Sequence, residues 1–394
     1  MSHQRTVITG GQIVTEQGIY GASHCLLIEK GNLTFVGRKD QLPVSLSSCE
    51  VIQVGEQHLI LPGFIDVHIH GAAGADVMDA TEEALHTMSQ ALPQEGTTSY
   101  LATTITQSDE AISQALAQVA QYMKKEHEGA EVLGIHLEGP FINVDQAGAQ
   151  PKDQVIPPSV KQFAQWQRIA EGHIKLVTLA PEEDTDGLIE HLSQQGVIPS
   201  MGHTNATYER VSDAVKRGVT HATHLFNAMK GMHHREPGTV GAALLHDEIM
   251  AEIIFDNLHV RHEMVQLAYR HKGPDKMQLI TDAMRAKCLR NGKYDLGGQE
   301  VIVHDGEARL HDGTLAGSVL KMNDAVKNMA ALPTLSLKDL MKLSSLNAAK
   351  ELGVDDRKGS LAPGKDADIV ILNEHYKVQY TFCRGSLVYS NRKG

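Results

Sequence analysis

The chain has 394 residues, with 36 Lys plus Arg against 48 Asp plus Glu, which gives a formal net charge of −12 at pH 7. This acidic balance argues against a nucleic-acid-binding or anionic-membrane surface, although it leaves room for a local basic pocket that binds a small anion. No apolar run in the sequence reaches the roughly 18 residues of a membrane span. We therefore expect a cytoplasmic protein with one large domain and one small domain.

Residues 1–60 alternate short β-rich runs with glycine turns, a pattern typical of antiparallel hairpins. Residues 359–394 show the same pattern. Because both ends are β-rich, we expect them to pair into one small sheet domain. The β-rich runs lie at 5–9, 25–28, 33–37, 367–372, 377–382 and 387–389.

The central part of the chain alternates strand-like and helix-compatible segments. In the segment 109–127, apolar side chains recur at the spacing of three or four residues that predicts a helix. Eight such strand–helix units in about 290 residues fit a (β/α)₈ barrel. A doubly wound open sheet is the competing fold, but it would need a glycine-rich dinucleotide turn that this chain lacks. The predicted strands lie at 64–69, 98–103, 132–137, 174–179, 197–202, 219–224, 251–256 and 277–282.

Five residues at the ends of these strands are candidate metal ligands. His68 and His70 are two residues apart, so their side chains point to the same face of a strand. Glu138 follows an apolar run, and a carboxylate there is costly to bury unless it binds a cation or accepts several hydrogen bonds. Its two oxygens suit it to bridge two ions. His203 and His224 end consecutive strands.

Each of these residues also has a plain structural interpretation. A lone HxH pair is usually coincidental, a glutamate at this point can simply emerge into solvent, and a single histidine can be a hydrogen-bonded core residue. Five candidates at equivalent strand ends favour a shared metal site. His136 and His221 lie inside their strands, and we interpret them as core residues or as partners that support the ligands.

Asp282 closes the eighth predicted strand. A carboxylate beside a metal-bound water can accept its proton and later deliver it to a leaving group. The alternative is a helix N-cap. Imidazole and carboxylate ligands without thiolates suit Zn²⁺, Fe²⁺, Mn²⁺ or Co²⁺ and do not choose among them. Such an ion lowers the pKa of water from 15.7 to about 7, so no serine or cysteine nucleophile is required.

Linked motifs in the chain resemble a known family. The strand-end residues are similar to those of the amidohydrolase superfamily. Five segments resemble more closely its family of N-acetylglucosamine-6-phosphate deacetylases, namely HLEGPF at 136–141, GHT at 202–204, THLFNAM at 223–229, HREPG at 234–238 and LAGS at 315–318. The resemblance implies a barrel formed by residues 61–358, with a small β-sandwich domain formed by residues 1–60 and 359–394.

The resemblance also implies the reaction. The acetamide of N-acetyl-D-glucosamine 6-phosphate would be hydrolysed to D-glucosamine 6-phosphate and acetate by metal-activated hydroxide. Glu138, His203 and His224 would hold the principal ion. His68 and His70 would hold a second, so that each subunit carries one or two divalent ions. Asp282 would be the general base and acid.

The substrate-binding residues come from the resemblance as well. His259 would contact the sugar and help to polarise the carbonyl. Asn227 and the backbone of Ala228 would hold the phosphate, and Arg235 would reach the neighbouring active site of a homodimer. Two further residues are expected in the pocket. Leu315 would lie near the acetyl group, and Gln150 occupies the loop where some relatives have a titratable histidine.

Two other functions are weighed against this one. Dihydroorotases and hydantoinases usually bridge their metals with a carboxylated lysine at the end of the fourth strand, where this chain reads TLAP at 178–181. A non-catalytic scaffold would be expected to have lost ligands, and every ligand is present. Without the resemblance, Asn227 could belong to a helical turn and Arg235 to a surface ion pair of little energetic value.

Overall fold

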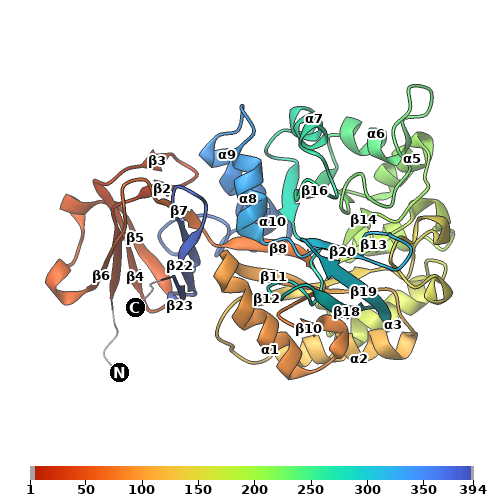
Figure 1. Ribbon diagram of the computed structural model, residues 1–394, viewed down its shortest axis with the longest axis horizontal. Coiled ribbons are helices and arrows are strands. Elements are labelled where there is room, and N and C mark those ends of the chain that lie inside the picture. Colours follow the sequence, from red (N-terminus) through yellow and green to blue (C-terminus); the bar gives the residue numbers. More distant parts are fainter. Residues whose placement is uncertain (1–4, 392–394) are drawn as a thin grey trace.

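The computed structural model describes residues 5–391, which form a barrel and a smaller sheet domain side by side. Figure 1 shows the sheet domain, built from both ends of the chain, at the left of the barrel. Within residues 5–391, no helix is long and apolar enough to cross a membrane.

Eight parallel strands form the barrel, as expected, in the order β17-β16-β15-β14-β13-β12-β11-β8. Two backbone hydrogen bonds join its first and last strands, from Asp282 N to His68 O at 2.8 Å and from His70 N to Ala283 O at 2.9 Å. The strands are β8 (Phe64–Ile69), β11 (Thr97–Thr104), β12 (Glu131–Glu138), β13 (Ile174–Leu179), β14 (Ile198–Met201), β15 (His221–Ala222), β16 (Met250–Ile254) and β17 (Met277–Ile280).

The predicted strand bodies are confirmed, but several predicted ends are wrong. The strands β14, β15, β16 and β17 all end before the predicted residue. Three predicted strand-end residues therefore lie just beyond their strands, namely His203, His224 and Asp282. The physical reason is that each has a left-handed backbone, with φ values of 48°, 34° and 47°, which ends an extended run.

Helices cover the outside of the barrel. In α2, Ser108 Oγ accepts a hydrogen bond from Ala111 N, and the apolar side chains of Ile112, Leu116 and Val119 are fully buried. The helix ends at Met123, earlier than the predicted segment 109–127. The helices are α1 (Glu82–Ala91), α2 (Asp109–Met123), α3 (Val160–Ile169), α4 (Leu188–Gln194), α5 (Tyr208–Arg217), α6 (Gly238–Leu245), α7 (His262–Lys272), α8 (Met322–Ala330), α9 (Leu337–Met341) and α10 (Asn347–Glu351).

Two sheets form the smaller domain, which confirms the expected β-sandwich. One has the order β5-β4-β1-β6, and the other joins the two ends of the chain in the order β23-β22-β21-β7-β2-β3. Side chains such as Ile8, Leu26, Ile60 and Phe382 form one buried cluster from both sheets. The strands are β1 (Thr6–Thr9), β2 (Gln12–Val14), β3 (Ile19–Tyr20), β4 (His24–Glu29), β5 (Asn32–Arg38), β6 (Glu50–Gln53), β7 (Leu59–Pro62), β21 (Ile369–Leu372), β22 (Val378–Cys383) and β23 (Ser386–Ser390). The domain division at residues 60/61 and 358/359 stays a prediction, since β7 runs through the first point without a break.

A three-stranded antiparallel sheet follows the eighth barrel strand, where the sequence analysis assigned no element. It consists of β18 (Gly292–Leu296), β19 (Gln299–His304) and β20 (Glu307–Arg309). Leu296, Val301 and Ala308 pack with Ile105, which follows β11, and with Met284, which follows β17. This sheet therefore covers the barrel at the carboxyl ends of its strands. A short hairpin, β9 (Gly71–Ala72) with β10 (Ala75–Asp76), lies beyond β8.

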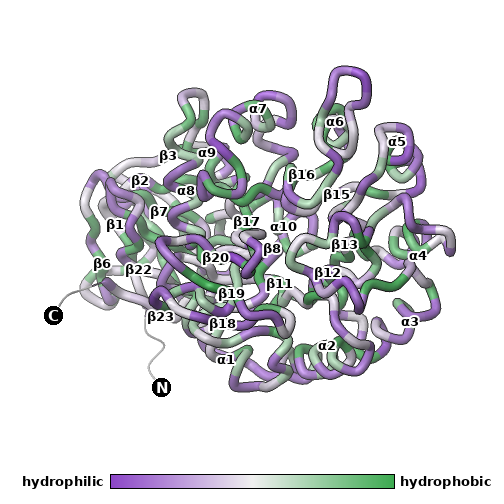
Figure 2. The backbone as a smooth tube through the Cα atoms, turned by 45° about the vertical axis from the view of Figure 1, so that its right-hand side comes forward, coloured by the Kyte–Doolittle hydropathy of each residue, from purple (hydrophilic) through white to green (hydrophobic). Residues whose placement is uncertain are grey.

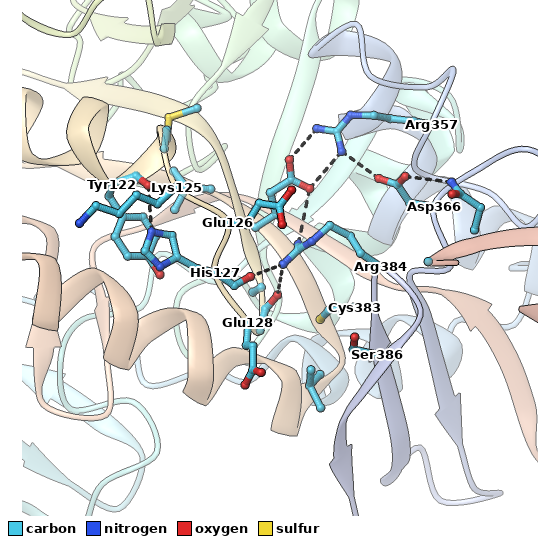
Figure 3. Close-up of a pocket in the computed structure, with 18 of the residues that line it drawn as sticks. Tyr122, Lys125, Glu126, His127, Glu128, Arg357, Asp366, Cys383, Arg384 and Ser386 are labelled. Atoms are coloured by element: carbon cyan, nitrogen blue, oxygen red, sulfur yellow. Dashed lines mark hydrogen bonds and ion pairs between the residues drawn. The ribbon is translucent and has the colours of Figure 1, made fainter. Parts of the chain in front are cut away.

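The barrel and the sandwich meet at a cavity of about 790 Å³ that is bordered by charged residues. Figure 3 shows Arg357 directed at Asp366 there, while the guanidinium of Arg384 is directed at the backbone oxygen of His127. Glu131, the first residue of β12, is 2.7 Å from Arg357 Nη2 and 2.8 Å from Lys358 Nζ. Burial alone would raise the pKa of Glu131, but Arg357 and Lys358 outweigh it and lower the pKa to about 2.

Replacing this carboxylate should weaken the attachment between the two domains. Glu131→Gln is expected to lower the free energy of unfolding by about 1–3 kcal/mol at about pH 7, because Lys358 loses one anion and Arg357 loses a bidentate partner. The folded-state pKa of Glu131 lies below its ordinary value of 4.5. Its contribution is therefore present above about pH 4.5 and is lost as the pH falls toward about 2.

Urea denaturation of the wild type and the variant, at about pH 7 and about pH 3.5, measures this difference. The gap between the two proteins should narrow at the lower pH. Glu126→Gln, at an exposed carboxylate on the same cavity, is the matched control and should leave stability unchanged. A gap that stays constant with pH would contradict the assigned ion pairs.

Candidate metal centre

The carboxyl ends of the barrel strands bring six of the predicted polar residues into one cluster. His68 lies near the end of β8 and His70 just beyond it, while Glu138 is the last residue of β12. His203, His224 and Asp282 follow β14, β15 and β17. All six side chains are buried or nearly so: His68, His70, Glu138, His203, His224 and Asp282.

Three of these residues form a compact donor group. His203 Nε2 is 3.1 Å from Glu138 Oε1, His224 Nε2 is 3.2 Å from the same oxygen, and the two nitrogens are 3.1 Å apart. Two ligands of a tetrahedral ion, bound at about 2.0–2.1 Å, lie roughly 3.3 Å apart. The ligand atoms of Glu138, His203 and His224 are therefore spaced like those around a single divalent ion.

A second donor group adjoins the first and shares Glu138 with it. His70 Nε2 is 3.2 Å from Glu138 Oε2 and 3.3 Å from Asp282 Oδ1. His68 Nε2 is 3.5 Å from both Glu138 Oε1 and Asp282 Oδ1. The atoms of His68, His70 and Asp282 lie close enough together to hold one ion. Because Oε1 of Glu138 contacts the first group and Oε2 contacts His70 of the second, this carboxylate could bridge two ions.

Hydrogen bonds behind the rings orient two of the histidines. His203 Nδ1 is 2.8 Å from the carbonyl oxygen of Gln146, and His68 Nδ1 is 3.0 Å from Glu252 Oε2. Each contact makes Nδ1 the donor and leaves the Nε2 lone pair facing the cluster. His68 Nε2 is buried and has no hydrogen-bond partner among the described residues. An unpartnered nitrogen aimed at two carboxylates is what a cation site requires, so the residues fit a bound metal.

The electrostatics of the cluster also call for a cation. Burial alone would lower the pKa of His70, but Asp282 and Glu138 outweigh it and raise the pKa to about 9. Burial would likewise raise the pKa of Glu138, yet His68, His203 and His224 hold it well below its ordinary value. The carboxylates thus stay ionised only because positive charge lies beside them.

The backbone at three of these positions is strained. His203, His224 and Asp282 have φ between 34° and 48°, and a left-handed backbone at a residue other than glycine costs about 1–3 kcal/mol. Such strain persists only where the surrounding structure enforces it, and it concentrates at functional sites. Here it turns three side chains, immediately after their strands, toward a common point.

The histidines inside the strands lie in the buried interior, in keeping with their interpretation as core or supporting residues. His136 Nδ1 is 3.2 Å from Val67 O, and its Nε2 is 2.7 Å from Thr178 Oγ1. His221 lies 3.0 Å from Glu252 through Nε2 and 2.8 Å from Glu351 through Nδ1. Both ring nitrogens of each residue are therefore engaged by the protein.

Two buried carboxylates at the site were missed by the sequence analysis. Asp66 accepts a 2.5 Å hydrogen bond from Thr281 Oγ1 and a 3.2 Å bond from His68 N. Glu252 contacts both His68 and His221. The sequence did contain a signal for these two residues, because burying an acidic side chain within an otherwise apolar parallel strand costs free energy unless the side chain is paired.

Two of the predicted substrate-binding residues, Gln150 and His259, have side chains that are hydrogen-bonded to other residues of the protein. Gln150 donates from Nε2 to Glu138 Oε2 at 2.7 Å and accepts from Thr106 N at 2.8 Å, so its amide is engaged by the protein itself. His259 Nδ1 is 2.6 Å from Asp256 Oδ2. Burial alone would lower the pKa of His259, but Asp256 and then Asp282 outweigh it and raise the pKa.

The remaining four predicted contacts lie on loops. Asn227 lies three residues after His224 and donates from Nδ2 to the His224 carbonyl at 3.2 Å. Thr204 N donates to the carbonyl of Ala228. Leu315 forms a backbone bridge with Arg309 at the edge of the three-stranded sheet. Arg235 is exposed within the hairpin of residues 233–236, and the structure does not bring it into the cluster of its own chain.

Comparison with known proteins agrees with this geometry. Residues 59–388 match the model of the amidohydrolase family. The chain is 50% identical over 346 residues to the N-acetylglucosamine-6-phosphate deacetylase of Bacillus subtilis, covering 87% of each chain. It is 35% identical over 382 residues to an N-acetylgalactosamine-6-phosphate deacetylase of Escherichia coli O157:H7, covering 97% of this chain and 98% of the relative.

Solved structures give the same result. A mutant N-acetyl-D-glucosamine-6-phosphate deacetylase from Mycobacterium smegmatis, in complex with N-acetyl-D-glucosamine-6-phosphate, superimposes with a TM-score of 0.91 at 28% identity. The match covers 99% of this chain and 100% of that chain.

Changing the shared carboxylate should affect both donor groups. Glu138→Gln is expected to weaken metal binding at both positions by more than about 100-fold, beyond the 10–100-fold typical of a supporting residue. The reason is that Gln lacks the charge and the second acceptor oxygen through which Glu138 serves both groups. Elemental analysis after dialysis against buffered Zn²⁺ measures the effect, and a variant that retained wild-type metal content would contradict the bridging position.

Proposed function

This chain belongs to the amidohydrolase family, and on that premise we propose that it hydrolyses the acetamide of N-acetyl-D-glucosamine 6-phosphate to D-glucosamine 6-phosphate and acetate. The observation that carries the proposal is the convergence of two donor groups on Glu138 at the mouth of the barrel. The deacetylase relatives, which match most of the chain, support this choice of substrate.

Two divalent ions would be held by the two donor groups. Glu138, His203 and His224 would hold one, and His68 and His70 would hold the other beside Asp282. Zn²⁺, Fe²⁺, Mn²⁺ and Co²⁺ all suit these ligands. A bound ion of this kind supplies Lewis acidity and lowers the pKa of water to about 7.

Asp282 is the proposed proton carrier. Burial alone would raise its pKa, but His68 and His70 outweigh it and hold the pKa below the ordinary value. The carboxylate is therefore ionised and can accept a proton from the attacking water. It then delivers that proton to the amine nitrogen as the carbon–nitrogen bond breaks, a role that contributes about 10²–10⁴-fold to rate.

His259 is proposed to act on the substrate carbonyl. Its Nδ1 donates to Asp256, and the raised pKa of the ring favours a proton on Nε2 as well. An Nε2 proton can donate to the carbonyl oxygen as negative charge develops there. Asp256 fixes the ring in this orientation. Gln150 and Leu315 are proposed to complete the wall of the acetamide pocket.

The phosphate is proposed to lie beyond His224, where the Asn227 amide and the backbone N–H of Ala228 can donate to its oxygens. Arg235 would come from the other subunit of a homodimer, since a guanidinium binds phosphate through two parallel hydrogen bonds. Its hairpin is exposed next to Met232, whose side chain is also exposed. Figure 2 shows the loop before α6 projecting from the barrel with a hydrophilic tip.

The compartment is proposed to be the cytoplasm. Cys25, Cys49, Cys288 and Cys383 all carry free thiols, as expected in a reducing environment. A second substrate is favoured by one comparison. The relative named N-acetylgalactosamine-6-phosphate deacetylase covers almost the whole chain, so the 4-epimer is the alternative substrate.

An acetate-release assay on three sugars tests the proposal. N-acetylglucosamine 6-phosphate should exceed unphosphorylated N-acetylglucosamine in kcat/KM by about 100-fold or more, because the phosphate contacts are charge-assisted. N-acetylgalactosamine 6-phosphate is the third substrate, and a higher kcat/KM for it would assign the alternative. A preference for the unphosphorylated sugar would overturn the phosphate site.

Asp282→Asn is the matched control for the chemistry. The amide keeps the shape of the side chain but cannot accept the proton, so turnover should fall by at least about 100-fold while the Glu138 donor group retains its ion. Near wild-type turnover in this variant would remove Asp282 from the mechanism.

Mixing two variants with different defects, Arg235→Ala and Asp282→Asn, tests the shared active site. Arg235→Ala should raise KM for the phosphorylated sugar, and Asp282→Asn should abolish turnover. In a mixed dimer, one site combines an intact Asp282 with an intact Arg235 from the other subunit. Equal mixing with subunit exchange should therefore restore about a quarter of wild-type activity. Activity that stays at the sum of the two variants would contradict the shared site.

A further inference from the structure

Glu252 is a fully buried carboxylate inside the barrel. It is the third residue of β16, with apolar side chains on both sides in the chain, and its side chain is 0% exposed. An ionised carboxylate in such surroundings requires partners that compensate for the loss of water. Its surroundings therefore show what the residue does.

Two strands and the residue His224, just beyond β15, contribute partners to Glu252. Its Oε2 lies 3.0 Å from His68 Nδ1, on β8, and accepts a 3.1 Å hydrogen bond from the backbone N of His224. Its Oε1 lies 3.0 Å from His221 Nε2, on β15. Glu252 thus contacts members of both donor groups without entering either of them.

The charge of Glu252 is balanced on one side by His221. That ring lies between Glu252 Oε1 and Glu351 Oε1, at 3.0 and 2.8 Å. Burial alone would lower the pKa of His221, but Glu351 and Glu252 outweigh it and raise the pKa to about 10. Gln278 Nε2 donates to the other oxygen of Glu351 at 3.2 Å. Because His221 balances the charge of Glu252 at Oε1, the other oxygen, Oε2, can accept a hydrogen bond from His68 Nδ1.

The contact with His68 determines which nitrogen of that ring faces the metal centre. With Nδ1 donating to Glu252, only Nε2 is directed at Glu138 and Asp282. A ring flip would break the bond to Glu252 and leave that carboxylate oxygen with the backbone N of His224 alone. By contrast, His70 Nδ1 is buried with no hydrogen-bond partner among the described residues. Of these two histidines, only His68 has its Nδ1 held by a carboxylate among the described residues.

A metal ion between His68, His136 and Glu252 would be another explanation of the same atoms, since they also lie close together. The hydrogen bonds of His136 exclude it. Both of its ring nitrogens are engaged, by Val67 O and Thr178 Oγ1. The side chain has no nitrogen left to bind an ion, so Glu252 acts on His68 through a hydrogen bond.

We propose that Glu252 is a positioning residue that fixes His68 as an Nε2 ligand and so controls whether the second metal position, formed by His68, His70 and Asp282, is filled. The inference rests on the proposed metal-dependent function and specifies what sets the metal count. Loss of Glu252 should empty one position and spare the other, because its side chain contacts the ring of His68 but reaches the other donor group only at the backbone N of His224.

Glu252→Gln tests the proposal by replacing one carboxylate oxygen with an amide nitrogen. An amide has a single acceptor oxygen, so it cannot accept from both His68 and His221. We expect the affinity of one Zn²⁺ position per subunit to fall by about 10–100-fold while the other is unchanged. Competition with a chromophoric chelator measures both affinities. Elemental analysis at a buffered free Zn²⁺ concentration should show a fall from two ions per subunit toward one.

Glu131→Gln is the matched control, because it makes the same substitution at a half-buried, ion-paired carboxylate at the domain junction. It should keep two ions. Two ions with wild-type affinities in Glu252→Gln would overturn the inference. A wild type that holds one ion and still releases acetate would also overturn it, while leaving the proposed function standing. A wild type that holds two ions but hydrolyses none of the sugars would instead contradict the proposed function.

A measurement on the wild type guards against a variant that fails to fold. In the Zn²⁺-loaded protein labelled with ¹⁵N-histidine, His68 should show a protonated Nδ1 that exchanges slowly with water. The signal is assigned by its absence from His68→Gln. A proton on Nε2 of His68, or a bare Nδ1, would overturn the proposal.

Discussion

A carboxylate buried at the mouth of the barrel, Glu138, is the constraint on which the site depends. Its two oxygens face different donor groups, at 3.1 Å from His203 and 3.2 Å from His70. Such a group keeps its charge away from water only beside positive charge. The histidines can supply that positive charge. The second carboxylate, Asp282, and the residues behind the ligands are arranged to tolerate it. A divalent cation would satisfy the arrangement, and the proposed hydrolysis of an amide would use the water that such an ion activates.

The scaffold serves this cluster in two ways. Parallel strands end together, so residues far apart in the chain meet at one edge, and the hydrogen bonds between His68, His70 and the segment 282–283 close the ring. Behind the ligands, Glu252 and Asp66 hold β8 against its neighbours. On the opposite side, Arg357 and Lys358 join Glu131 of the barrel to Asp366 and Asp368 of the sandwich. Strain at the ends of three strands is sustained by this closed structure.

Much of the fold could be predicted because its signals are local. Apolar runs of four to eight residues predicted the bodies of the barrel strands, and β8 and β13 have the expected bounds. The strand ends were less accessible, since a left-handed backbone at His203 or His224 has no mark in the residue type. The sheet of residues 292–309 was missed, because short alternating strands are marginal until they pack on Ile105 and Met284. Arg235 shows the converse limit, since the role proposed for it would depend on a second chain.

By itself, the sequence determined which residues can bind a metal, since imidazole and carboxylate groups at the ends of apolar runs are a matter of residue type and spacing. It also determined the alternation of strands and helices that makes a parallel barrel the stable solution. Only the tertiary structure decided which of those groups pair with one another. It places Gln150 on Glu138, joins His68 to Glu252, and balances Glu252 with His221 and Glu351. These pairings join residues up to 184 positions apart. They depend on barrel closure, and no local pattern in the chain encodes that geometry.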